Sequence, residues 1–187
     1  YQNRSGWSVS SAGDVNGDGL DDILIGAWRA SPNGTEAGEA YVVYGSSTFS
    51  SATFELSAID GSNGFVIKGI GDYDHVGEYV SSAGDINGDG FDDVIVSSRY
   101  RTVQGNSGAG ESYIVFGASS GFGSAFELSD LNGANGFTIY GNEALDRLGT
   151  SVSGAGDVNG DGIDDFIIGA EAANNYLGEV YVVFGNT

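Results

Sequence analysis

The sequence predicts an all-β fold built from repeated units of four antiparallel strands, the kind of unit that forms a blade of a β-propeller. Three observations support this prediction. One acidic ten-residue segment occurs three times, at intervals of 71 and 72 residues. Short apolar runs rich in β-branched residues follow each copy. Gly supplies 33 of the 187 residues and Pro only 1, which favours short strands joined by tight turns.

Each repeat contains candidate strands in the same order. A small-residue strand precedes the acidic segment, an apolar strand follows it, and a third strand ends in a Gly after Tyr-Val-Val or a close variant. The first strands are expected at 6–13, 77–84 and 149–156, the second at 23–26, 94–97 and 166–169, the third at 38–45, 110–117 and 178–185, and the fourth at 64–69 and 136–141. The unit is longer than common blades because of connections at 29–37, 46–53 and 118–125. We expect no helix longer than a turn or two.

The repeats divide a single domain, residues 1–187, into units of about 1–69, 70–141 and 142–187. The third unit lacks a fourth strand. Three blades are too few to close a ring, since propellers typically have four to eight. Two alternatives follow: the chain is a fragment of a longer repeat array, or it completes its ring with copies of itself, in which case two copies would give six blades.

The acidic segment reads GDVNGDGLDD at 13–22, GDINGDGFDD at 84–93 and GDVNGDGIDD at 156–165. Oxygen-bearing side chains recur at every second residue, so a looped backbone can turn several of them toward one centre. This matches the opening of a calcium loop, in which positions 1, 3, 5 and 7 supply oxygens and Gly at position 6 permits a sharp bend. In the first copy the candidate ligands are the side chains of Asp14, Asn16, Asp18 and Asp22 and the backbone carbonyl of Leu20.

The helix-loop-helix form of this loop ends with a Glu at position 12, where this chain has Ile25, Val96 and Ile168. The loop is therefore not an EF-hand. Position 9 would take the bidentate role, and a strand follows at once, so we expect a site between two strands. Asp, Asn and Gly also build ordinary tight turns. Three copies, each confining three carboxylates, favour calcium over a plain turn, and over magnesium, which demands a tighter octahedron.

Composition excludes several classes of partner. The formal net charge is −20 with only 6 basic residues, which argues against binding to nucleic acid or to an anionic membrane. The sequence has no Cys, so it offers neither disulfides nor thiol chemistry. Its apolar runs are too short for membrane insertion, and its opening residues do not have the pattern of a signal peptide.

The repeat unit resembles the FG-GAP repeats of integrin α-chain β-propellers and their bacterial relatives. The resemblance rests on four features in a fixed order: the small-residue strand, the D-x-N-x-D-G-x-x-D loop, the apolar strand and the G-E-x-Y-[VI]-V-[FY]-G strand. The resemblance covers nearly the whole chain. It implies four-stranded blades, one Ca²⁺ in each of three hairpins, and an extracellular or cell-surface role in adhesion or recognition. Integrin heads resemble seven-blade rings, and this chain differs from them in the number of its blades. By position, the implied calcium ligands are Asp14, Asn16, Asp18, Leu20 and Asp22; Asp85, Asn87, Asp89, Phe91 and Asp93; and Asp157, Asn159, Asp161, Ile163 and Asp165.

The sequence does not predict an enzyme. The single His, His75, occurs in one repeat of three, which favours a surface role over a catalytic one, and no Ser stands in a nucleophile motif. Loop residues outside the repeat pattern are better candidates for recognising an unknown protein or glycan. They are Trp28 and Arg29 together with Arg99, Tyr100 and Arg101. Alternatives to an adhesion module are an accessory propeller of a secreted hydrolase and a lectin-like propeller.

Overall fold

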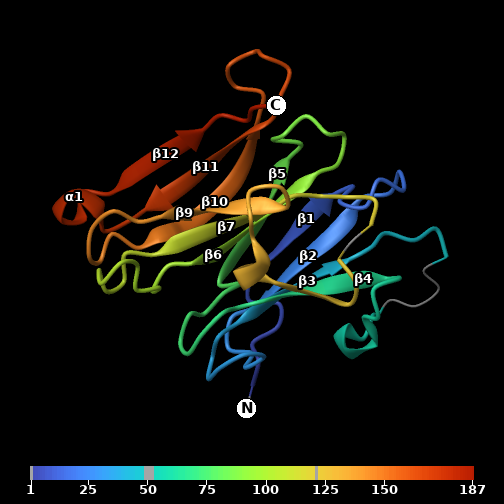
Figure 1. The fold of residues 1–187 in the computed structure, drawn as a ribbon, viewed down its shortest axis with the longest axis horizontal. Helices are drawn as coiled ribbons and strands as arrows, with labels where there is room; N and C mark the ends of the chain where they lie inside the picture. Colours follow the sequence, from blue (N-terminus) through green and yellow to red (C-terminus); the bar gives the residue numbers. More distant parts are fainter. Residues whose placement is uncertain (1, 49–52, 121) are drawn as a thin grey trace.

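The computed structural model describes residues 2–48, 53–120 and 122–187, and it contains three β-sheets that follow one another along the chain (Figure 1). The predicted connections at 46–53 and 118–125 lie partly outside the described residues. The first sheet is formed by β1 (Val9–Gly13), β2 (Asp22–Ala27), β3 (Glu39–Val43) and β4 (Gly64–Lys68), each antiparallel to the next. All four correspond to the strands that the sequence predicts.

The second sheet repeats this arrangement, and the third repeats it in part. The second contains β5 (Tyr79–Gly84), β6 (Asp93–Ser98), β7 (Glu111–Val115) and β9 (Gly136–Tyr140). The third contains β10 (Leu148–Gly156), β11 (Asp165–Ala170) and β12 (Glu179–Val183). Within the described residues β12 has no strand on its outer side, as expected from the missing fourth-strand sequence.

One strand was not predicted. β8 (Ala125–Glu127) belongs to the second repeat in sequence, but it pairs in parallel with β4 of the first sheet. The pairing runs from Val66↔Ala125 to Lys68↔Glu127. The first sheet therefore has five strands, and the connection between β7 and β9 crosses from one sheet to its neighbour. This pairing adds a backbone link between two repeats.

Helices are short throughout the described residues, as predicted. They are two 3₁₀ turns, η1 (Leu56–Ala58) and η2 (Leu128–Asp130), and one four-residue helix, α1 (Ala173–Tyr176). None of these described helices has the length and apolar character needed to cross a membrane.

The sheets stack on one another through two separate apolar cores. The first core lies between the first and second sheets and includes Leu24, Val42, Val94 and Val96; the second lies between the second and third sheets and includes Ile95, Ile114, Phe166 and Ile168. Neighbouring residues of β6 thus face opposite cores. A sheet buried on both faces needs a continuous apolar run instead of an alternating one, which explains the Val-Ile-Val sequence of β6.

The first strands of the three sheets lie next to one another, with β5 between β1 and β10. Figure 1 shows the sheets arranged as an open fan, with the first and third sheets at its two ends. Within the described residues they do not close into a ring. Within the described residues neither end of the stack has a neighbouring sheet, although Leu56 and Ile59 pack over part of the outer face of the first sheet, next to Tyr41.

Candidate functional site

The three acidic loops join the first and second strands of their sheets, as the sequence predicts. In each sheet the strand register shifts at the last Gly of the first strand, Gly13, Gly84 or Gly156. These glycines have φ of 74°, 76° and 66°, a left-handed conformation that Gly adopts without a steric penalty. A bulge of this kind bends the strand out of the ladder and leads it into the loop.

The carboxylate at position 1 organises the turn in each loop. Asp14 Oδ1 accepts hydrogen bonds from the backbone N–H groups of Gly17 and Asp18 at 2.8 and 3.0 Å, and its Oδ2 accepts one from Gly19 at 2.8 Å. Backbone donors aimed at a carboxylate favour its charged form, and such bonds lower the pKa of Asp157 in the third loop. Asp157 repeats all three bonds, and Asp85 repeats those from the backbone N–H groups at positions 5 and 6.

Positions 3, 5 and 7 are linked to one another. Asn16 Oδ1 accepts a hydrogen bond from the Asp18 backbone N–H at 2.8 Å, and Asn16 Nδ2 donates to Asp18 Oδ2 at 3.1 Å. Asp18 Oδ1 in turn accepts from the Leu20 backbone N–H at 2.9 Å. The same bonds recur among Asn87, Asp89 and Phe91, and among Asn159, Asp161 and Ile163. The structure therefore gathers the side chains of positions 3 and 5.

The carboxylate at position 9 is buried and ties the loop to the third strand. Asp22 is 1% exposed, and its two oxygens accept hydrogen bonds from the backbone N–H groups of Val15 at 3.0 Å and Gly45 at 2.8 Å. Burial raises the pKa of Asp22 to about 6 and that of Asp93 to about 7, although these backbone bonds act in the opposite direction. Asp93 and Asp165 make the corresponding bonds in their loops.

The loop carboxylates have no cationic partner among the described residues. The ion pairs of this part of the chain all involve other acidic groups. Nor do three acidic or histidine side chains of the described residues already stand close enough to hold one metal ion. Positions 3 and 5 touch, whereas the position 9 carboxylate is directed to its two backbone donors.

The donor set nevertheless fits a hard cation. Carboxylate, amide and backbone carbonyl oxygens are the ligands that Ca²⁺ takes in proteins. A carboxylate oxygen that accepts one N–H retains further lone-pair capacity, so metal coordination does not require the backbone hydrogen bonds of Asp14 or Asp22 to break. The residues present are chemically suited to the ion that the sequence pattern implies.

Position 8 of the loop has a role that the sequence reasoning missed. Asp92 Oδ2 accepts a hydrogen bond from the backbone N–H of Asp14 at 2.7 Å, and the Asp92 N–H donates to the Asp14 carbonyl at 3.1 Å. Asp164 bonds to Asp85 in the same way, at 3.1 and 3.3 Å. The second and third loops are thus each bonded to the loop of the preceding sheet. The repeated Asp-Asp dipeptide was the available signal.

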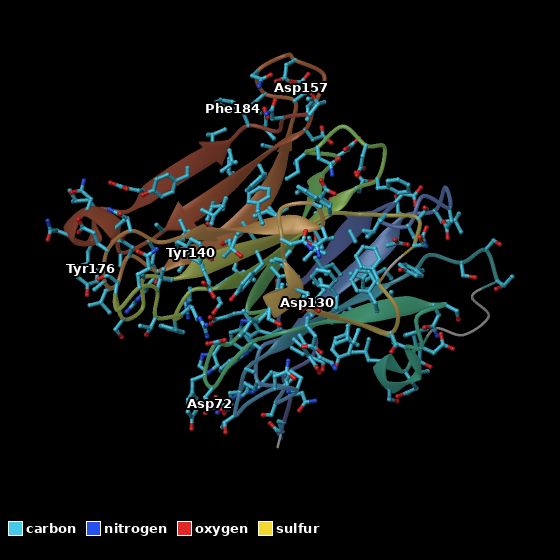
Figure 2. All side chains as sticks on the ribbon, in the orientation of Figure 1. Asp72, Asp130, Tyr140, Asp157, Tyr176 and Phe184 are labelled. Carbon is cyan, nitrogen blue, oxygen red and sulfur yellow. The ribbon has the colours of Figure 1, made fainter. Side chains whose placement is uncertain are left out.

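A second candidate site lies at the other end of the sheets, where the second strands end. Figure 2 shows Asp157 of the third acidic loop and Asp72, which precedes β5, on opposite sides of the molecule. His75 joins the two groups of residues singled out in the sequence: its ring lies 4.8 Å from that of Trp28 and 6.1 Å from that of Tyr100. The Trp7 ring lies 5.9 Å from that of Trp28, and Arg147 lies over the Tyr100 ring at 5.8 Å. We give the name aromatic–arginine cluster to Trp7, Trp28, Arg29, His75, Arg99, Tyr100 and Arg147.

Ion pairs and ring contacts hold this cluster together. Arg29 lies over Trp28 at 5.1 Å and bonds to Glu36 at 2.5 Å; this hydrogen bond lowers the pKa of Glu36. Arg99 lies over Tyr100 at 4.6 Å and pairs with the buried Glu78 at 2.9 Å. Arg101 pairs with the buried carboxylates of Asp74 and Glu111 instead of lying over an aromatic ring.

The aromatic–arginine cluster also holds unsatisfied polar atoms. Among the described residues, buried side-chain atoms without a hydrogen-bond partner are found on four of its members and on the neighbouring Glu78. They are Trp28 Nε1, His75 Nδ1, Glu78 Oε2, Arg99 Nε and Arg147 Nε. Buried polar groups are normally paired with protein, water or ligand, so these five atoms have unused hydrogen-bonding capacity.

Stacked antiparallel sheets, each with an acidic loop between its first and second strands, define a class of β-sheet repeat protein. The chain belongs to the FG-GAP repeat family, whose model matches residues 5–43, 79–115 and 148–183, one match in each sheet. It is 37% identical over 137 residues to a phosphatidylinositol-glycan-specific phospholipase D of Dictyostelium discoideum, a match that covers 67% of this chain and 14% of that protein.

Integrin α chains are also similar to it. Integrin alpha-4 of Xenopus laevis is 32% identical over 161 residues, covering 85% of this chain, and integrin alpha pat-2 of Caenorhabditis elegans is 31% identical over 197 residues, covering 97%. In both cases the match spans 14% of the relative. The chain therefore corresponds to a small part of the curated relatives that it matches.

Proposed function

We propose that the chain is a calcium-binding segment of a β-propeller that acts in extracellular recognition or as a scaffold. Membership of the FG-GAP family supports this proposal. Each loop would hold one Ca²⁺ through positions 1, 3, 5, 7 and 9. In the first loop these are Asp14, Asn16, Asp18, the Leu20 carbonyl and Asp22, and the other two loops would use their matching residues.

The observation that carries the proposal is the uncompensated charge of the loops. Each loop confines three carboxylates, the third of them buried, and none is paired with a basic side chain of the described residues. Two unit charges about 4 Å apart repel by roughly 4 kcal/mol at an effective dielectric near 20. A bound divalent cation reverses the sign of this energy. A plain turn does not require charged side chains, since a neutral Asn or Ser oxygen can accept the same kind of backbone hydrogen bond.

Isothermal titration calorimetry with CaCl₂ tests the proposal. We expect about three sites per chain, with dissociation constants of roughly 0.1 to 1 mM, as is typical of extracellular modules. An Asp157→Ala substitution should remove one site, because Asp157 lies in the exposed third loop. Asp130→Ala, which removes a carboxylate outside the loops, should leave three. A flat titration of the unmodified chain would contradict the assignment.

The stacking of the sheets supports the propeller part of the proposal. The first strands lie side by side, as the inner strands of blades do around a central axis. The chain would then contribute three blades of a larger ring, with the acidic loops at one end and the aromatic–arginine cluster at the other.

We assign ligand recognition to the aromatic–arginine cluster. Exposed loops on a rigid scaffold often carry binding function, and Trp, Tyr and Arg are the residues that most often dominate binding energy at interfaces. A glycan array and a pull-down with surface proteins would identify the ligand class. Arg29→Ala and Arg99→Ala should weaken binding at least tenfold, and Lys68→Ala, which removes a basic residue elsewhere, should not. Equal binding by all variants would overturn this assignment.

A second candidate function is that of an accessory propeller in a secreted hydrolase. The similarity to a phosphatidylinositol-glycan-specific phospholipase D favours it. In either case we propose that this segment is not itself catalytic. The coding sequence on either side of this segment distinguishes the two functions: a hydrolase domain supports the accessory role, and further repeats or a surface anchor support adhesion.

A further inference from the structure

The connection that crosses from the second sheet to the first forms one wall of a pocket. After β8 pairs with β4, the chain turns through η2 and returns to β9. Leu128, Ser129 and Leu131 of this return line a pocket of about 420 Å³, together with residues of β7, β9 and the loop that follows β6. The pocket lies between two neighbouring sheets that the structure describes, so its opening does not depend on the unpaired ends of the stack.

The pocket contains a buried carboxylate and its arginine partner. Glu111 is 4% exposed, and its Oε1 accepts a hydrogen bond from the Tyr113 hydroxyl and lies 3.1 Å from Arg101 Nε. Within the described residues neither Glu111 Oε2 nor Arg101 Nη2 makes a hydrogen bond, and neither belongs to the buried atoms that lack a partner. One carboxylate oxygen and one guanidinium nitrogen are therefore accessible and free to bond to a ligand.

Arg101 occurs in only one of the three repeats. It is the third residue after β6, and the third residues after β2 and β11 are Ala30 and Ala173. The Glu–Tyr pair beside it recurs with the same hydrogen bond in the other sheets, as Glu39 with Tyr41 and Glu179 with Tyr181. The repeated scaffold thus accounts for the pair but not for Arg101. Function is carried by sites added to a fold, and this residue is such an addition.

Neutral hydrogen-bonding groups also line the pocket. They are the side chains of Thr102, Gln104, Ser129 and Thr138, and none of the four makes a hydrogen bond with the described residues. Apolar surface is supplied by Leu128, Leu131 and the ring of Tyr140, which is 55% exposed. A sugar ring matches this mixture, because its hydroxyls both donate and accept hydrogen bonds and its C–H groups pack against an aromatic face.

The charges of the pocket favour an uncharged ligand. Arg101 already pairs with two carboxylates, those of Asp74 and Glu111, so a cationic ligand would compete with it. An anionic ligand would be repelled by the same carboxylates and by the net charge of −20. The pocket volume lies at the lower end of the range for small-molecule sites, which suits a ligand the size of a monosaccharide or disaccharide.

We propose that this pocket binds a neutral sugar residue, with Glu111 and Arg101 bonding to its hydroxyls and Tyr140 packing against its ring. The site shares no residue with the aromatic–arginine cluster or with the acidic loops. The inference therefore goes beyond the proposed function and rests neither on calcium nor on ligand recognition by that cluster.

Amide NMR spectra of the nitrogen-labelled chain test the proposal during titration with the methyl glycosides of glucose, galactose, mannose and N-acetylglucosamine. We expect at least one to bind with a dissociation constant on the order of 1 mM, as befits a ligand of this size, and to shift the amide signals of Gln104, Ser129 and Thr138. Sodium acetate and ethylammonium chloride, which are charged probes, should leave these signals unchanged.

Three outcomes of the titration would overturn the proposal. They are a response to none of the glycosides, a response at these amides to a charged probe alone, and glycoside-induced shifts confined to residues such as Trp28 and Tyr100. The third outcome would place the sugar at the aromatic–arginine cluster, so it would support the recognition function proposed above while removing this pocket. The two proposals can therefore fail separately.

Substitutions at the accessible side of the pocket test the assignment of its residues. Thr138→Val replaces a hydroxyl with a methyl group of similar shape in β9, and Tyr140→Ala removes an exposed ring, so both variants should fold. Each should weaken binding of the glycoside at least fivefold. Tyr176→Ala is the matched control, since it removes a ring that is 69% exposed outside the pocket, and it should bind as the unmodified chain does. Unchanged affinity in both pocket variants would contradict the proposal.

Discussion

The carboxylate of Asp92 bonds to the backbone N–H of Asp14 at 2.7 Å, although 78 residues separate the two. Asp14 opens the first acidic loop and Asp92 lies in the second, so one loop directly supports the next. Asp164 repeats the contact with Asp85. Folding of the loops and stacking of the sheets are therefore coupled, and the first two predictions below follow from this coupling.

Asp92→Ala should destabilise the chain by about 1 to 3 kcal/mol, because it leaves a backbone N–H without its charged acceptor. Thermal unfolding followed by circular dichroism measures the effect. Asp21→Ala is a matched control, since it removes the same charge at the same loop position where the carboxylate has no described partner. It should change the melting temperature little. If Asp92→Ala and Asp21→Ala lowered the melting temperature equally, the contact between Asp92 and Asp14 would contribute nothing to stability.

Gly13→Ala should destabilise the chain more than Gly156→Ala. Both residues have positive φ, so both substitutions incur a similar backbone penalty of roughly 1 kcal/mol. Only at Gly13 would the added Cβ also displace Asp92. We expect an extra loss of about 1 to 3 kcal/mol in the free energy of unfolding from urea titrations. If the two variants were equally stable, the close approach at Gly13 would not matter.

Arg101→Met should be strongly destabilising and pH-dependent. Arg101 pairs with Asp74 and Glu111, which are 3% and 4% exposed. Removing one partner of a buried ion pair typically costs about 3 to 5 kcal/mol. Arg29→Met, which breaks a more exposed pair with Glu36, should cost much less, because solvent screens exposed ion pairs.

The pH dependence of Arg101→Met follows from Glu111. Burial raises the pKa of Glu111, and Arg101 acts in the opposite direction, so the substitution should raise this pKa further. An acid whose folded pKa lies above its unfolded value binds protons more tightly in the folded state. The variant should therefore recover stability as the pH falls from 7 toward 5. A destabilisation that is constant across this range would contradict this explanation.

Much of the fold could be predicted because each repeat contains the same local sequence pattern. The apolar run of β6 and the bulge at Gly84 are local features, and their sequence signals are unambiguous. The strand β8 could not be predicted, since residues 126–129 resemble residues 54–57 and only the later copy forms a strand. Its partner, β4, belongs to another repeat, and such pairing has no local signature.

In the candidate sites, too, local features could be predicted and contacts between repeats could not. Positions such as Asp14 and Asp22 were identified from spacing alone, and most of their hydrogen bonds recur in all three loops. The role of Asp92 could not be predicted from its own loop, because its partner Asp14 belongs to the preceding repeat. His75 was interpreted as a surface residue, yet its side chain is only 16% exposed and lies between Trp28 and Tyr100. The roles of Asp92 and His75 depend on contacts between repeats, and the sequence of a single repeat does not reveal such contacts.

The most direct test of the account is thermal unfolding in 5 mM CaCl₂ and in excess EGTA at the same ionic strength. A site at 100-fold excess over its dissociation constant contributes roughly 2.7 kcal/mol. Even partial saturation of three loops should thus raise the melting temperature by about 10 °C or more, and equimolar MgCl₂ should reproduce little of the gain. Superimposable melting curves in calcium and EGTA would contradict the claim that the acidic loops fold around a divalent cation.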